Sequence, residues 1–289
     1  MTPPVIEVNR RVADRGETLP LKSVGHHSFA LLQMKSRLFM LPFEDRLPKK
    51  TSMTGAREAQ KFRLETMELT SAEFSDRFIA ALGPFAPGFA REALALHAWR
   101  VRERNEVMNL TRITEPEEMA IRHAADSLAA LPLLAEGGET IFQHLLDLGT
   151  GAGYPGLSIA IACPHLKVTL LDSRKKKIAF LQELVEELGI GDRVQCVWGR
   201  FEDWIRAHRK EVDLVTARAV GPVERLLDWC THNYYGPLLL WKGPAANEEL
   251  AAVEGLMWKR KLFVALDEPY QIPGDEAIRR LILIDNQKS

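Results

Sequence analysis

The sequence is poor in cysteine, and its three thiols, Cys163, Cys196 and Cys230, show no metal-ligand spacing. An odd number of scattered cysteines predicts neither a disulfide framework nor a metal site. No apolar run approaches the roughly 18 residues that a membrane-spanning helix requires. The first 30 residues also lack a compact apolar stretch with a small-residue cleavage site. We therefore expect no secretory signal and no membrane, and we place the protein in the cytoplasm.

The near-neutral charge is uneven along the chain. Residues 1–66 hold 12 basic and seven acidic side chains, a net charge of +5, whereas the remaining 223 hold 26 and 32, a net charge of −6. This asymmetry is typical of an arm that binds a polyanion, although an unstructured extension with incidental charge would give the same count. Repeated prolines interrupt the segment. We expect residues 1–66 to be a flexible basic extension or an upstream-start artefact.

Residues 67–138 carry helical signals. Thr70 and Glu73 have capping-box spacing, and Gly83 would end the helix that follows. Pro87 would open a second helix, and Thr114 would cap a third. The length of the chain allows one to two domains. We expect residues 67–138 to be a minor unit, a small helical cap.

From residue 139 onward, short apolar runs alternate with helix-length segments, of which Arg174–Leu188 is the clearest. This alternation predicts an α/β core over residues 139–289, with a mostly parallel sheet covered on both faces. The last two runs follow each other without a helix, which suits an antiparallel closing pair. The runs are Ile141–Leu148, Val168–Leu171, Arg193–Val197, Val212–Ala217, Pro237–Trp241, Leu262–Leu266 and Arg280–Ile284.

A glycine-rich loop follows the first of these strands. Gly151, Gly153 and Gly156 spell the dinucleotide fingerprint G-x-G-x-x-G. Asp147 with Gly149, Gly151 and Gly153 instead spells the acidic-x-G-x-G-x-G pattern of S-adenosylmethionine (SAM) enzymes. In this strand–turn–helix context a purely structural turn is the third interpretation. Glycines allow the backbone to approach a ligand closely, and the carboxyl end of the strand is where such sheets bind ligands.

Asp172 ends the next strand and could accept hydrogen bonds from ribose hydroxyls of either ligand. Two features favour SAM. Asp147 is placed to hold the loop and the methionine amine, and no second domain-sized segment remains for a hydride-transfer substrate.

A run of four cations, Arg174, Lys175, Lys176 and Lys177, follows Ser173, which could cap the next helix. The helix dipole disfavours cations there by roughly 0.3–1 kcal/mol each at low salt. The placement therefore indicates a phosphate contact, with a solvated basic face as the alternative. Lys242 and Arg279 or Arg280 could also hold RNA phosphates, or be plain surface charges.

Taken together in order, the motifs resemble the RsmG (GidB) family, bacterial enzymes that methylate guanine N7 in 16S ribosomal RNA. The resemblance covers residues 70–286 and implies a class I SAM-dependent methyltransferase fold. That fold is Rossmann-like, with a seven-stranded, mostly parallel sheet and a small helical N-terminal cap. It also implies SAM as cofactor and 16S rRNA or the small ribosomal subunit as partner, and we expect a monomer. The matching stretches are Asn109–Thr111, Arg122–His123, Asp126–Leu128, Asp147–Gly156, Leu171–Ser173, Arg200–Glu202, Thr216–Ala219 and Trp241–Gly243.

Carried over by position, the resemblance implies that Gly149 and Tyr154 contact SAM and that Phe201 and Glu202 lie by the adenine. Arg218 would complete the pocket. Two departures stand out. Arg104 occupies a position where the family usually has an aromatic residue, and the arm before Met67 has no counterpart.

Guanine N7 carries a lone pair and no proton, so its methylation needs alignment rather than a general base. We therefore expect no certain catalytic residue. Arg218 is the candidate for orienting the SAM carboxylate or guanine O6, unless it forms an ion pair with a strand-end carboxylate. His123 could reach the cleft or be purely structural. A small-molecule methyltransferase and a non-catalytic SAM-binding regulatory module remain the alternative functions.

Overall fold

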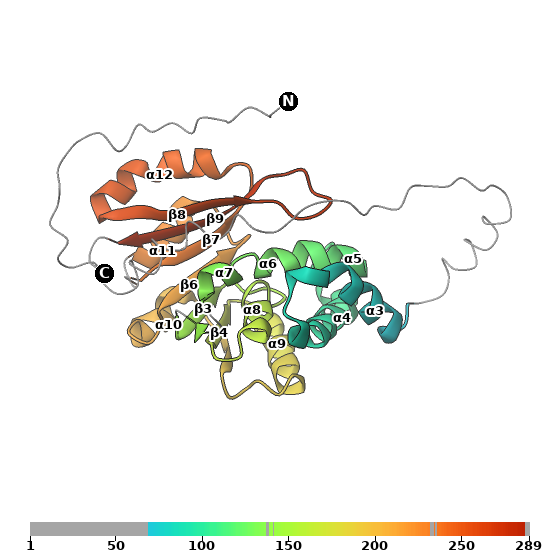
Figure 1. Cartoon of the computed structure of the whole chain (residues 1–289). Helices are drawn as coiled ribbons and strands as arrows, with labels where there is room; N and C mark the ends of the chain where they lie inside the picture. Colours follow the sequence, from blue (N-terminus) through green and yellow to red (C-terminus); the bar gives the residue numbers. More distant parts are fainter. Residues whose placement is uncertain (1–68, 137–138, 141, 232–233, 235, 287–289) are drawn as a thin grey trace, which may run out of the picture.

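The computed structural model describes residues 69–136, 139–140, 142–231, 234 and 236–286. Within them, a helical segment precedes a twisted sheet that carries helices on both faces (Figure 1). The extension expected at residues 1–66 lies outside the described residues.

The first helix shows how local sequence sets an element boundary. The Thr70 hydroxyl accepts a hydrogen bond from the Glu73 amide at 3.3 Å, and the Glu73 carboxylate accepts one from the Thr70 amide at 3.1 Å. This confirms the capping box. Gly83, with φ of 43°, ends the helix. The elements of this segment are α3 (Ser71–Leu82), η2 (Gly83–Phe85), η3 (Gly88–Ala90), α4 (Arg91–Met108), α5 (Pro116–Met119), η4 (Ala120–Ala125, a π-helical turn), α6 (Asp126–Leu128) and α7 (Leu131–Leu134), then the short pair β1 (Ala135–Glu136) and β2 (Glu139–Thr140).

Two predicted helix starts in this segment are wrong. The second helix does not open at Pro87: a 3₁₀ turn comes first, and α4 begins at Arg91. Thr114 does not cap the third helix, because α5 begins at Pro116 with Glu115 at the N-cap position and no side-chain cap. Proline at N1 fixes the start of this helix without a capping side chain.

All seven predicted strands are present and form one sheet in the order β5-β4-β3-β6-β7-β9-β8. The first five strands in this order, β5 to β7, are parallel to one another. Strand β9 is antiparallel to both β7 and β8. The predicted closing pair is therefore confirmed. The strands are β3 (His144–Leu148), β4 (Lys167–Asp172), β5 (Val194–Trp198), β6 (Leu214–Arg218), β7 (Leu238–Lys242), β8 (Leu262–Tyr270) and β9 (Arg279–Asn286).

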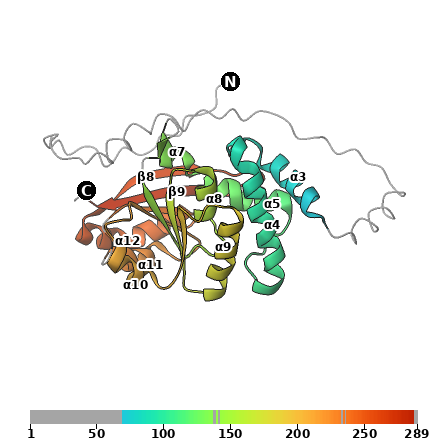
Figure 2. The same ribbon diagram turned by 90° about the horizontal axis from the view of Figure 1, so that it is seen from below.

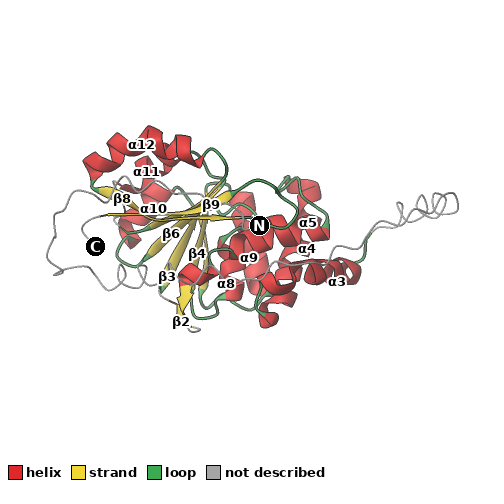
Figure 3. Ribbon diagram, turned by 45° about the horizontal axis from the view of Figure 1, so that its top comes forward, coloured by secondary structure: helices red, strands yellow, loops and turns green. Residues whose placement is uncertain are grey.

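The helices divide between the two faces of the sheet, as Figure 3 shows. Along β3, Leu145 packs into the hydrophobic core beneath α8 and α9, whereas the next residue, Leu146, packs into the core beneath α10, α11 and α12. This alternation follows from the pleat of a strand that is buried on both faces. The helices are α8 (Gly156–Ala162), α9 (Lys175–Glu187), α10 (Phe201–His208), α11 (Val223–Thr231) and α12 (Ala246–Arg260).

The helical segment packs on the same side as α8 and α9 (Figure 2). Phe74, Phe78 and Leu94 from this segment share one continuous core with residues of α8 and α9. Because β3 to β7 are parallel, their carboxyl ends lie along one edge of the sheet, and the helical segment reaches this edge. That edge is where open α/β sheets bind ligands.

Candidate functional site

The glycine-rich loop turns directly after β3. Gly149, Gly151 and Gly153 have φ of 68°, 61° and 95°, a region that residues with a Cβ rarely adopt. The Gly149 amide donates to the Leu171 carbonyl at 2.8 Å, which fastens the loop to β4. The glycine pattern thus reflects backbone geometry that favours glycine at three positions of one loop.

Asp147 holds the loop from beneath and is fully buried. One carboxylate oxygen accepts a hydrogen bond from the Gly156 amide at 2.9 Å, and the other accepts one from the Thr216 hydroxyl at 3.1 Å. Burial raises the pKa of Asp147 to about 6, although these hydrogen bonds act in the opposite direction. The loop-holding role is confirmed, and contact with the methionine amine stays a prediction.

This carboxylate also bears on the choice between a dinucleotide and SAM. Pyrophosphate sites use free amide groups at a helix N-terminus, and here Asp147 already accepts from the first amide of α8. In its ionised form this carboxylate would place a negative charge beneath a pyrophosphate. SAM carries a positive sulfonium and an ammonium, which that charge attracts. The geometry therefore favours SAM.

Asp172 lies at the end of β4 and is 8% exposed. Its Oδ2 accepts from the Gly151 amide at 3.1 Å and its Oδ1 from the Arg174 amide at 2.8 Å. Each oxygen keeps a second acceptor position for a ribose hydroxyl. Ser173 does not cap α9 as expected, because Arg174 occupies the N-cap position without a side-chain cap.

Tyr154 is held between two histidine rings. Its ring centroid lies 4.5 Å from that of His97 and 4.7 Å from that of His123, with both pairs stacked. Its buried hydroxyl has no hydrogen-bond partner among the described residues. Beneath it, His97 Nε2 donates to the Ala152 carbonyl at 2.7 Å. A buried polar atom without a partner, beside a glycine loop at the strand ends, fits a polar ligand such as SAM.

The two histidines are electrically neutral in this setting. Burial lowers the pKa of His97 to about 4, and burial together with the nearby Arg218 lowers that of His123 to about 3. His123 Nε2 lies 2.8 Å from the Thr111 hydroxyl, which ties it to the Asn109–Thr111 turn. No sequence pattern pointed to His97, because its partner Ala152 is 55 residues away.

Arg218, at the end of β6, is bound by the helical segment. Its Nε lies 3.0 Å from Asp126 Oδ2, and one terminal nitrogen donates to the Ser127 hydroxyl at 3.0 Å. The other donates to the Arg122 carbonyl at 2.6 Å. The side chain is 15% exposed. The ion-pair alternative is therefore realised, although the partner comes from α6 and not from a strand end. A contact of Arg218 with SAM or guanine stays a prediction.

Asp126 contacts residues of four strands, and the sequence alone did not indicate this role. Its side chain is 1% exposed, and beside Arg218 it accepts from the Tyr270 hydroxyl at 2.7 Å and lies 3.4 Å from Arg279. Its backbone carbonyl accepts from the Trp241 indole at 2.8 Å. One residue thereby joins the helical segment to β6, β7, β8 and β9. Asp126 does belong to Asp126–Leu128, one of the stretches that carry the family resemblance, and this was the only sequence pattern that marked it.

Phe201 and Glu202 begin α10. Phe201 is 2% exposed and its side chain packs in the core beneath α10 to α12, whereas Glu202 is half-buried. Any contact between Phe201 and adenine would therefore come from its backbone. The adenine contact of both residues stays a prediction.

The basic candidates separate into two groups. Arg174, Lys175 and Lys176 are exposed, and Lys177 turns toward the glycine loop, with its Nζ 3.7 Å from where a Cβ on Gly151 would lie. By contrast, Lys242 is 8% exposed.

The ammonium group of Lys242 is used internally, and its role as an RNA-phosphate ligand stays a prediction that these contacts disfavour. It donates to the Gly221 carbonyl at 2.7 Å and pairs with Glu249 at 2.7 Å. Arg279 pairs with Asp126 and Asp275, and Arg280 pairs with Asp267.

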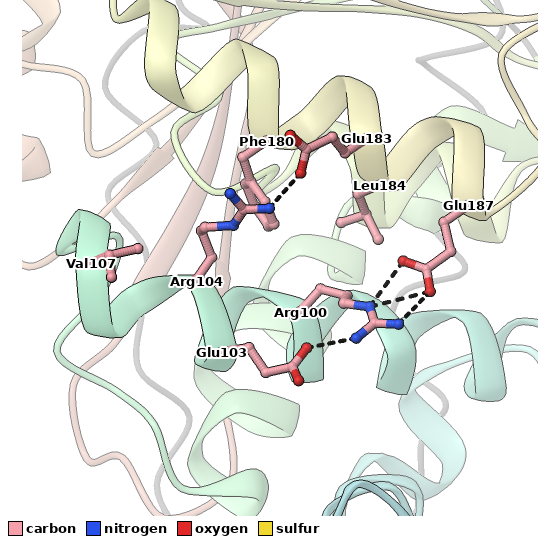
Figure 4. A pocket seen from close by; sticks show the side chains of 8 residues that line it. All are labelled: Arg100, Glu103, Arg104, Val107, Phe180, Glu183, Leu184 and Glu187. Carbon is pink, nitrogen blue, oxygen red and sulfur yellow. Dashed lines mark hydrogen bonds and ion pairs between the residues drawn. The ribbon is translucent and has the colours of Figure 1, made fainter.

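A cavity of about 440 Å³ lies between α4 and the second half of α9, away from the glycine loop (Figure 4). Arg100 pairs with Glu187 at 2.6 Å across it, and Arg104 pairs with Glu183. The Arg104 guanidinium also lies 5.6 Å from the Phe180 ring centroid. Arg104 thus packs on an aromatic ring at the position where an aromatic residue was expected.

In the part of the chain that the structure describes, no three histidine, cysteine or carboxylate side chains are grouped to hold a metal ion. No helix in that part is long and apolar enough to cross a membrane.

The seven-stranded sheet with its antiparallel β9, the glycine loop and the two strand-end aspartates define a class I SAM-dependent methyltransferase. Residues 91–267 match the model of the GidB family, described as rRNA small subunit methyltransferase G, and the chain belongs to this family. The predicted resemblance is thereby confirmed.

Curated relatives support the same family. Ribosomal RNA small subunit methyltransferase G of Symbiobacterium thermophilum is 40% identical over 220 residues, covering 73% of this chain and 87% of that protein. The protein of the same name from Solibacter usitatus is 35% identical over 192 residues, covering 66% and 88%. Among solved structures, the mitomycin 7-O-methyltransferase MmcR is 17% identical, with a TM-score of 0.46, and the match covers 80% of this chain and 76% of that one.

Proposed function

We propose that the protein transfers the methyl group of SAM to N7 of a guanosine in 16S rRNA. The observation that carries this proposal is the family match over residues 91–267, which includes most of the helical segment as well as the glycine loop and the ends of β4 and β6. Methyltransferase function alone would need only the sheet and its loop. The added match in the helical segment supports an RNA substrate.

The site has the properties that this reaction requires. SAM supplies an electrophilic methyl group on a sulfonium. Asp172 would hold the ribose, and the loop with Tyr154 would hold the methionine part. Guanine N7 has no proton to lose, so the neutral His123 has no proton-transfer task. Arg218 fixes the helical segment against the end of β6, and its fixed charge orients the SAM carboxylate or guanine O6.

RNA phosphates bind the exposed cations Arg174, Lys175 and Lys176, beside the cofactor site. Residues 1–66, which lie outside the described residues, add a net charge of +5. Filter binding of 16S rRNA over a salt series should give a smaller slope after removal of residues 1–66. An unchanged slope would refute a binding role for this segment.

We also propose that residues 67–138 act as a cap on the core of residues 139–289, and that the protein works as a monomer in the cytoplasm. Light scattering of the full chain, alone and with SAM, should give the mass of one chain.

The decisive experiment supplies labelled SAM with bare 16S rRNA in one reaction and assembled small subunits in another. Nucleoside analysis of either product should show label in 7-methylguanosine. Label in no RNA would refute the proposal, and label only in a small molecule from a cell extract would favour the alternative enzyme. SAM binding without transfer to any acceptor would favour the regulatory module.

A further inference from the structure

Helix α9 has acidic side chains toward its C-terminus and cations at its N-terminus. Both placements are unfavourable, because the helix dipole favours anions at the N-terminus and cations at the C-terminus. The acids have a structural explanation. Glu183 and Glu187 pair with Arg104 and Arg100 of α4, so they join the helical segment to the core.

The cations have no such explanation. Among the described residues, no carboxylate forms an ion pair with Arg174, Lys175 or Lys176, and all three are exposed. An external anion would account for cations kept at an unfavourable helix end.

Trp198 lies beside these cations and is 58% exposed, which is unusual for so large an apolar side chain. It ends β5 in register with Asp172 of β4. Its indole nitrogen donates to the Ser173 carbonyl at 3.0 Å, so the ring is held in place. The Lys175 ammonium lies 5.2 Å from the ring centroid, within cation–π distance.

We propose that Trp198 is a stacking platform for an unpaired nucleobase of the RNA strand that flanks the target guanosine. The fixed aromatic ring can stack on a base, and the unpaired cations beside it can bind the phosphates of the same single strand. An apolar protein surface would not explain the cations, and duplex RNA would bury its base faces. The register with Asp172 places this subsite next to the proposed cofactor site. The inference rests on the proposed function, since it assigns part of its RNA contact.

The test uses the full chain and three variants: Trp198→Ala, Trp198→Phe and, as the matched control, Trp258→Ala. Trp258 is 82% exposed in the last turn of α12 and is followed by Lys259, Arg260 and Lys261, but it precedes β8 and does not follow the carboxyl end of a strand. The probes are a short single-stranded oligoadenylate, a duplex RNA of equal length and SAM. Binding is measured by fluorescence anisotropy for RNA and by calorimetry for SAM.

We expect Trp198→Ala to raise the Kd for oligoadenylate by roughly 5- to 150-fold, the range for loss of one base–aromatic stack. Trp198→Phe, which keeps an aromatic face, should lose much less, and duplex binding and SAM affinity should stay unchanged. The inference is overturned if Trp198→Ala binds oligoadenylate as wild type does, if Trp258→Ala weakens it equally, or if the loss falls on SAM. Oligoadenylate binding needs no turnover. It therefore tests the stacking role of Trp198 even if methyl transfer to 16S rRNA fails. If Trp198→Ala transfers methyl groups and binds oligoadenylate as the wild type does, only the stacking role is refuted, and the proposed function stands.

Discussion

Arg218 Nε lies 3.0 Å from Asp126 Oδ2, and this pair joins the end of β6 to α6, across the boundary between the sheet and the helical segment. The carboxylate is almost fully buried, and its other oxygen accepts from Tyr270. This buried charge pair is therefore one of the contacts that hold the helical segment against the cofactor edge.

Replacement of Asp126 by Asn should lower the free energy of unfolding by about 3 kcal/mol or more, because Arg218 is left buried without its counter-charge. Urea denaturation measures the change. Glu183→Gln, which breaks an exposed pair with Arg104, is the matched control and should cost less than about 1 kcal/mol. Equal losses in the two variants would contradict the hub role of Asp126.

Gly156→Ala should destabilise the loop. An added Cβ would lie 2.5 Å from Asp147 Cβ and 2.7 Å from a Leu170 methyl group, so the strand or the helix must shift, at a cost of about 1–3 kcal/mol. SAM affinity should fall with it.

Gly255→Ala serves as its control, since nothing lies within 4 Å of an added Cβ there in α12. Alanine in a helix interior should raise stability by about 0.5–1 kcal/mol. Calorimetric SAM titration and thermal unfolding of both variants give the readouts. Unchanged SAM affinity in Gly156→Ala would argue against the loop as the cofactor site.

Stability should fall as pH is lowered from about 6.5 to 4. The pKa values of His97 and His123 are depressed to about 4 and about 3 in the folded protein, so the unfolded chain binds more protons in this window. Each histidine contributes at most about 1.4 kcal/mol per pH unit. Asp147 acts in the opposite direction, because its raised pKa of about 6 makes the folded state take up a proton there. Burial also lowers the pKa of His144, so three histidines act against Asp147, and the net effect on acidification is a loss.

His97→Gln should reduce this pH dependence, since glutamine does not titrate. Chemical unfolding of the variant and the wild type at pH 7.5 and pH 5.0 measures the difference. The histidine account fails if both proteins lose the same free energy on acidification.

Lys176→Met should reduce the salt slope of 16S rRNA binding by about one, as expected for the loss of one phosphate contact. Lys242→Met should leave the slope unchanged, because that ammonium is paired with Glu249 inside the protein. Filter binding over a salt series separates the two. A smaller slope for Lys242→Met would instead identify Lys242 as a phosphate ligand.

The sequence was informative where short-range patterns decide structure. The seven apolar runs predicted the strands, and the Thr70–Glu73 spacing predicted a cap, because both depend on neighbours a few residues away. Thr114 and Ser173 were false caps: Pro116 begins its helix without a capping side chain, and Arg174 occupies the N-cap position of α9. The stacking of His97 on Tyr154 and the Asp126 hub could not be predicted, because they join residues far apart in the chain.

The site was predictable to a similar extent. The loop and Asp172 are marked by a contiguous motif, and the structure places them together. Lys242 looked like a surface cation at a strand end, and only the fold brings Glu249 against it. Trp198 carried no motif, and its significance depends on its register with Asp172 and its contact with Lys175.

The most direct test of the central claim is mass spectrometry of nucleosides from 16S rRNA treated with SAM and either the wild-type protein or Asp172→Asn. We predict 7-methylguanosine with the wild type. We also predict a drop of about tenfold or more in kcat/KM for SAM with Asp172→Asn, from loss of a charge-assisted ribose contact. A methyl group on another atom, no methylated nucleoside, or full activity of Asp172→Asn would contradict the account.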